Sequence, residues 1–81
     1  MKLVDIQEQV IDIICRAIGV DSSELTEKVS IGDLPEWDSV GNLAILAALE
    51  EELQIEIPLE DLFEMNSVAS IIEEVKKLTD A

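Results

Sequence analysis

One serine stands where its hydroxyl could react. In the stretch "PEWDSVGNLAI", residues 35–45, Ser39 follows Asp38 and comes directly before apolar residues with helical spacing. A helix N-terminus presents unpaired N–H groups and a partial positive charge, which stabilise an exposed anion by about 0.3–1 kcal/mol. A phosphate esterified to Ser39 would therefore be well placed. Serine is also a common residue in the first turn of a helix, where it serves capping alone, so the pattern by itself leaves both interpretations open.

The chain lacks the side chains for catalysis of its own. It contains no histidine, no tyrosine and one cysteine, which leaves carboxylates and a few lysines as titratable groups. No base stands near Ser39, so another enzyme would have to activate its hydroxyl, and the protein would be a substrate or a carrier, not an enzyme. No metal site is expected, because the acids at Asp33, Glu36 and Asp38 lack the glycine and glutamate spacing of a calcium loop.

The charge balance excludes several classes of partner. Nineteen acidic and five basic residues give a formal charge of -14, which repels nucleic acids and anionic lipids and favours partners with basic surfaces. No apolar run approaches the about 18–20 residues of a membrane span, and acids interrupt the N-terminal segment where a signal peptide would be apolar. We expect a cytoplasmic monomer with one compact core, in which Cys15 is a small buried side chain.

The hydrophobic pattern predicts an all-α fold, a small bundle of three longer helices and one short helix with a long first loop. The first helix spans residues 3–18 and ends before Gly19, and the loop of residues 20–38 holds at most one short helical turn after Ser22 or Ser23. Asp38 caps a second helix over residues 39–53. The segment "QIEIP" alternates like a strand but has nothing to pair with, so Pro58 is expected to begin a short third helix, "LEDLF". Ser67 caps the last helix, whose apolar face is Val68, Ile71, Ile72, Val75 and Leu78.

This order of elements resembles the acyl carrier protein family over residues 3–79. The centre of the resemblance is "EWDSVGNLAILAALEEELQIEIPLEDL", which is similar to the family's Asp-Ser-Leu motif followed by an aliphatic helix, an acidic helix end and an "I-x-I-P" segment. In that family the serine carries 4'-phosphopantetheine from coenzyme A, so the resemblance assigns attachment to Ser39, with Asp38 before it. The thiol of the arm, not Cys15, would hold an acyl group as a thioester. Residues 1–81 would form a single acyl-carrier domain.

The resemblance also implies partners: a phosphopantetheinyl transferase, an acyl or aminoacyl ligase, and acyltransferase or synthase enzymes. Val40 replaces the usual Leu or Met, and residues 39–49 contain no charge, whereas carriers of fatty-acid synthases display carboxylates along this helix. We therefore expect a carrier of a dedicated pathway, for a polysaccharide, lipid or secondary metabolite. The motif "WDSxGxL" also resembles the free-standing carriers of such pathways. A D-alanyl-type aminoacyl carrier is the nearest alternative. An acidic DNA mimic is more distant, since it would need carboxylates along one face.

Several neighbours of Ser39 have two interpretations. Trp37 could pack on Leu43 or a nearby turn, which we favour, or lie exposed and contact a partner. Gly41 costs a helix interior about 1 kcal/mol against alanine, which indicates close approach of another backbone or of the arm. Two groups follow from the resemblance. The expected partner contacts are Trp37, Val40, Gly41, Glu60 and Asp61, and the expected lining of the acyl chain is Val40, Leu43, Leu46, Ile57, Phe63, Ile71 and Ile72.

Overall fold

The computed structural model describes residues 5–79, and these form the expected helical bundle. Its elements are α1 (Ile6–Ile18), the 3-10 turn η1 (Ser22–Glu24), α2 (Ser39–Leu53), α3 (Leu59–Leu62) and α4 (Val68–Thr79). The described residues contain no strand, only an isolated antiparallel bridge between Ser30 and Ser67. The all-α prediction, with one short helix among three longer ones, is therefore confirmed. Residues 3 and 4 of the predicted first helix lie outside the described residues.

The helix ends follow from their capping residues. The Asp5 carboxylate accepts a hydrogen bond from the Gln7 N–H at 3.1 Å, and α1 ends at Gly19, whose φ of 74° is the left-handed conformation that glycine adopts without strain. The predicted cap of α4 is also present, because the Ser67 hydroxyl accepts from the Ser70 N–H at 3.1 Å. α3 is one residue shorter than expected, with Phe63 as its C-cap.

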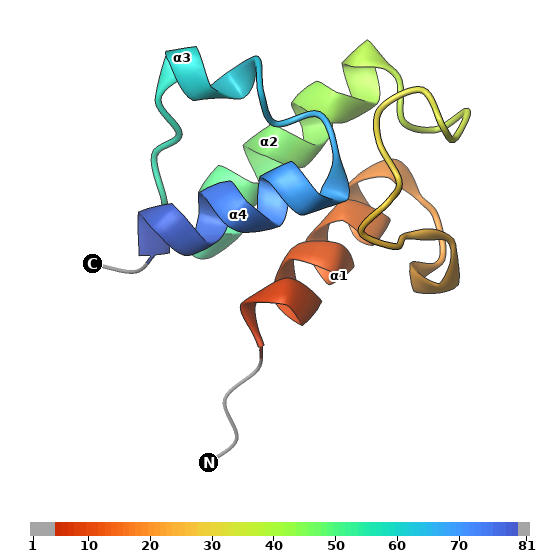
Figure 1. The fold of residues 1–81 in the computed structure, drawn as a ribbon, viewed down its shortest axis with the longest axis horizontal. Helices are drawn as coiled ribbons and strands as arrows, with labels where there is room; N and C mark the ends of the chain where they lie inside the picture. Colours follow the sequence, from red (N-terminus) through yellow and green to blue (C-terminus); the bar gives the residue numbers. More distant parts are fainter. Residues whose placement is uncertain (1–4, 80–81) are drawn as a thin grey trace.

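The core lies where the apolar faces of α1, α2 and α4 meet, and Figure 1 shows α2 and α4 between α1 on one side and α3 on the other. Its fully buried side chains include Val10 and Ile14 of α1, Ile45 and Leu49 of α2, and Ile71 of α4. Cys15 is buried among them, as expected. Among the described residues no helix is long and apolar enough to cross a membrane.

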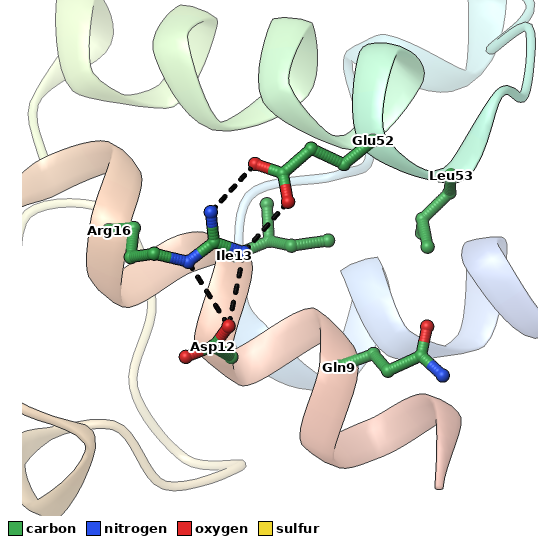
Figure 2. A pocket seen from close by; sticks show the side chains of 6 residues that line it. All are labelled: Gln9, Asp12, Ile13, Arg16, Glu52 and Leu53. Atoms are coloured by element: carbon green, nitrogen blue, oxygen red, sulfur yellow. Dashed lines mark hydrogen bonds and ion pairs between the residues drawn. The ribbon is translucent and has the colours of Figure 1, made fainter. Parts of the chain in front are cut away.

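An ion-pair cluster joins α1 to the C-terminal end of α2, at the opposite end of that helix from Ser39 (Figure 2). The Arg16 guanidinium donates to both carboxylate oxygens of Glu52, at 2.7 and 3.0 Å, and also contacts Asp12 at 3.0 Å. A hollow of about 230 Å³ lies beside this cluster. Its charged groups are already paired with one another, so they hold the two helices together.

The long first loop is held against the start of α4. The Ile31 N–H donates to the Asn66 carbonyl at 2.8 Å, and the Val68 N–H donates to the Val29 carbonyl at 2.9 Å. Leu25 anchors the loop in the core with 4% exposure. Gly32, at a φ of 93°, then turns the chain so that its N–H meets the Trp37 carbonyl at 2.9 Å. These contacts tie the loop to the start of α4 and residue 32 to residue 37, and so they hold the segment that leads into α2.

Candidate functional site

Ser39 is the first residue of α2, and its side chain is exposed. The helix start is well formed, because the Asp38 carboxylate accepts from the Gly41 N–H at 2.8 Å and the Asp38 carbonyl accepts from the Asn42 N–H at 2.8 Å. The N–H groups of Ser39 and Val40 bond to no other described residue. An anion on the Ser39 hydroxyl would therefore meet free backbone donors and the positive end of the helix dipole.

Two open hollows flank Ser39. The first is a groove of about 510 Å³ between α2 and the segment that holds α3, and most of its lining side chains are apolar. Ser39 lies at its edge. We call it the α2–α3 groove; it is lined by Ile31, Ser39, Asn42, Leu43, Leu46, Leu59, Leu62, Phe63 and Asn66. The second hollow, of about 500 Å³, is lined by Ile31, Gly32, Leu34, Pro35, Trp37, Asp38 and Ser39. An elongated group attached to the Ser39 hydroxyl would have room on either side.

The α2–α3 groove fits the prosthetic group that the resemblance implies. Phosphopantetheine is a phosphate ester followed by an arm that contains amide groups and ends in a thiol. Ser39 offers an exposed hydroxyl beside free N–H donors, and the groove offers apolar walls with two carboxamides, Asn42 and Asn66. The residues present can therefore hold such an arm: Ser39 as the point of attachment and the groove as the surface along which the arm lies.

Trp37 is part of the core. Its side chain is fully buried, and its indole N–H donates to the Asn42 side-chain oxygen at 2.9 Å. The packing interpretation is therefore correct and the partner-contact interpretation of Trp37 is wrong, because a buried ring presents no surface to a partner. The hydrogen bond to Asn42, five residues on, was not predicted from the sequence.

Gly41 lies where another part of the backbone comes close. A Cβ atom at this position would be 2.5 Å from the Glu36 carbonyl oxygen and 3.3 Å from the Ile18 Cγ2 atom. The glycine therefore allows the segment before α2 to fold tightly over the first turn of the helix, which agrees with the close backbone approach expected there.

The expected lining residues divide into two groups. Leu43, Leu46 and Phe63 line the α2–α3 groove, whereas Ile57, Ile71 and Ile72 are core residues that the groove does not reach. These last three would touch a bound chain only if the bundle opened. Val40 is 74% exposed and is not among the groove residues, so the expectation that it lines the acyl chain is not supported, and it lies on the surface.

Sequence reasoning missed Ile31, Asn42, Leu59, Leu62 and Asn66 as groove residues. A signal existed for Asn42, because residues three apart lie on the same face of a helix and Asn42 is three residues after Ser39. No local signal marks Ile31 or Asn66. Their place in the groove comes from the hydrogen bond between their own backbones, which joins segments far apart in the chain.

The two acids named on the third helix are not equivalent. Glu60 is exposed and forms no ion pair with another described residue, so its carboxylate is free to meet a partner. Asp61 instead faces α4, where it contacts Lys77 at 3.7 Å and shares a hydrogen bond with Glu74 when that acid is protonated. This shared hydrogen bond, together with burial, raises the pKa of Glu74. Over residues 5–79 no cluster of three or more acids or thiols could hold a metal ion.

Comparisons with known proteins place the chain in a family. A family model described as "Phosphopantetheine attachment site" matches residues 8–75. The acyl carrier protein of Clostridium acetobutylicum is 34% identical over 73 residues, which cover 90% of this chain and 95% of that protein. The acyl carrier protein of Syntrophobacter fumaroxidans is 31% identical over 77 residues, with 95% of each chain covered.

The fold agrees with these matches. The solution structure of holo acyl carrier protein from Geobacter metallireducens superposes with a TM-score of 0.82 at 23% identity, covering 95% of this chain and 88% of that one. The chain therefore belongs to the acyl carrier protein family, whose members bear phosphopantetheine, carry acyl groups on it for acyl-handling enzymes, and are carriers rather than catalysts.

Proposed function

We propose that Ser39 is the attachment residue and that this carrier serves one dedicated pathway. The observation that carries the first part is the position of the Ser39 hydroxyl, exposed at the capped start of a helix of 15 residues and at the edge of the apolar groove. In the loading step the Ser39 Oγ atom attacks the phosphorus of coenzyme A that bears pantetheine. The new O–P bond replaces the pyrophosphate linkage, adenosine 3',5'-bisphosphate leaves, and the transferase takes the hydroxyl proton.

An apolar cargo agrees best with the groove. Its walls are mainly aliphatic and aromatic, and Leu43, Leu59 and Phe63 are 65%, 72% and 81% exposed in their places along it. Covering such side chains with an acyl chain gains about 25 cal/mol for each Å² removed from water. A D-alanyl group would cover much less of this surface, so an acyl group is favoured over that alternative.

The exposed face of α2 favours partners that recognise an apolar surface. We call the exposed residues Val40, Leu43, Ala44 and Ala47 the neutral face, since none carries a charge. A DNA mimic would need carboxylates there, so this face argues against that function. It also lacks the acids that basic patches of fatty-acid synthase enzymes would meet. The acids that remain near the site, such as Glu36 and Glu60, lie outside this face.

Loading is tested by mass. The protein is incubated with coenzyme A and a broad-specificity phosphopantetheinyl transferase, and we expect a gain of one phosphopantetheine that Ser39→Ala abolishes. Ser22→Ala is the matched control, because Asp21 and Ser22 form a second Asp-Ser pair that opens a helical turn, but Ser22 lines neither hollow beside Ser39. An equal gain in Ser39→Ala would refute the assignment.

The dedicated pathway is tested by comparing carriers. A malonyl transferase and a ketosynthase of general fatty-acid synthesis should use the loaded protein poorly beside their own carrier. The double variant Ala44→Glu with Ala47→Glu, which places acids on the neutral face, should be used better, and Gln54→Glu at the far end of α2 should not. If the parent chain serves these enzymes as well as their own carrier does, the proposal is wrong.

A further inference from the structure

The α2–α3 groove contains a polar side chain, Asn42, whose orientation is fixed by a hydrogen bond from a buried residue. Asn42 is half-buried, lines the groove and lies three residues after Ser39 on α2, which is about 4.5 Å along the helix axis. Its neighbours on the groove walls are mainly apolar side chains. A carboxamide at this place is the first polar side chain that an arm leaving Ser39 and entering the groove would meet.

The hydrogen bond from Trp37 determines which end of the carboxamide is engaged and which end is left free. An indole N–H can only donate, so the Asn42 atom 2.9 Å from it must be the carbonyl oxygen. The amide NH2 of Asn42 is then turned away from the buried ring. These N–H donors bond to no other described residue. The Asn42 side chain itself is held in place by Trp37, which is fully buried.

The prosthetic arm has the matching group. Its amide carbonyls lose hydrogen bonds to water when they enter an apolar groove, and an unpaired buried carbonyl is costly. A donor on the groove wall removes that cost. On the opposite side of the groove, Asn66 supplies a second carboxamide that forms no side-chain hydrogen bond within the described chain.

We propose that Asn42 binds the phosphopantetheine arm by donating from its side-chain NH2 to an amide carbonyl of the arm, and that Trp37 is the positioning residue that orients it. This inference rests on the proposed attachment at Ser39. It assigns a role to the buried indole N–H that packing alone does not require, because Trp37 acts on the arm through Asn42.

The test compares apo and holo protein by NMR, with mass measured on the same samples. The chain has two asparagines and one tryptophan, so the side-chain NH2 signals of Asn42 and Asn66 and the indole N–H signal are readily assigned. On loading, we expect the Asn42 NH2 signals to shift and their exchange with water to slow by about two- to tenfold, the range of one net hydrogen bond. Unchanged Asn42 signals in fully loaded protein would refute the inference.

Three variants separate binding from support of the fold. Asn42→Asp keeps the acceptor for Trp37 and removes the donors, and Asn42→Leu removes the donors without adding charge. In both variants, the changes in the NMR signals of Leu46 and Phe63 that loading causes should fall by about half or more, as expected when one hydrogen bond holding the arm is lost. Gln54→Glu, the same amide-to-acid change at the far end of α2, should leave them as in the parent protein. Groove signals that stay at parent values in both Asn42 variants would also refute the inference.

Trp37→Phe tests the positioning role. It removes the indole N–H but keeps an aromatic ring in the core, so Ser39 should still load while the Asn42 NH2 signals respond less to loading. A full response in Trp37→Phe would remove Trp37 from the proposal. If Ser39 gains no mass in the parent protein, both the proposed attachment and this inference fail; if it gains mass and Asn42 does not respond, the inference alone fails.

Discussion

The tight turn over the first residues of α2 makes a sharp prediction for Gly41→Ala. In an open helix this change stabilises a protein by about 1 kcal/mol, because alanine is the better helix former. Here the new Cβ atom would lie 2.5 Å from the Glu36 carbonyl oxygen, whereas Cβ contacts below 3.0 Å are essentially never observed. The neighbour is backbone, so it cannot rotate away as the end of a flexible side chain would.

The expected result is a net loss of stability. Forcing extra volume into a packed place costs about 1–3 kcal/mol. Moving Glu36 also disturbs Asp38, two residues later, and losing a helix cap costs about 0.5–2 kcal/mol. After the gain in helix propensity is subtracted, we expect Gly41→Ala to lower the free energy of unfolding by about 0.5–4 kcal/mol, with a fall in Tm of about 4–8 °C for each kcal/mol.

Urea unfolding followed by circular dichroism measures this difference. Ala47→Gly, an exposed change in the same helix, is the control and should cost about 1 kcal/mol through helix propensity alone. If Gly41→Ala is as stable as the parent protein or more stable, the close approach of the Glu36 carbonyl does not constrain the helix start, and the reasoning is refuted.

Three further predictions concern buried groups. Trp37→Phe should lower the free energy of unfolding by about 1–3 kcal/mol, measured in urea, because the hydrogen bond to Asn42 and part of the ring are lost; an unchanged value would contradict this. The pKa of Glu74 is raised by its hydrogen bond with Asp61 and by burial, so its ionisation should weaken the fold as pH rises from the unfolded-state value near 4.5 through the raised folded-state value. Glu74→Gln should therefore gain stability relative to the parent at pH 7 and lose that advantage near pH 4, and a pH-independent difference would contradict it. Burial, with Asp12 nearby, raises the pKa of the Cys15 thiol, so a thiol reagent at pH 8 should find no fast-reacting group in apo protein and one in holo protein; fast reaction of the apo form would contradict this.

Much of the fold could be predicted because the helix signals are local. The faces of α1 and α4 repeat with helical spacing, and Asp38 and Ser67 mark helix starts where the structure has them. The site was harder to predict. The groove combines residues from the first loop, α2, α3 and the segment before α4, and no spacing along the chain encodes that combination.

Trp37 shows the same limit on a smaller scale. Its place one residue before the cap is compatible with both packing and exposure. The ring is buried in the structure because it packs in the core and its N–H bonds to Asn42. Ile71 and Ile72 show the reverse case. Their helical spacing correctly predicted burial, but burial in the core is not contact with the groove.

The sequence by itself determined that the protein is an acidic, all-α chain, because charge, composition and helix periodicity need no distant contacts, and its motif around Ser39 indicated the carrier family by resemblance. It contains two Asp-Ser pairs, each at the start of a helical turn, and local physics treats them alike. The family resemblance singles out Ser39, and the tertiary structure supplies the physical difference between the two serines. Ser22 opens a turn of three residues that adjoins neither hollow, whereas hydrogen bonds from the first loop to residues 66–68 bring Ser39 to the edge of an apolar groove.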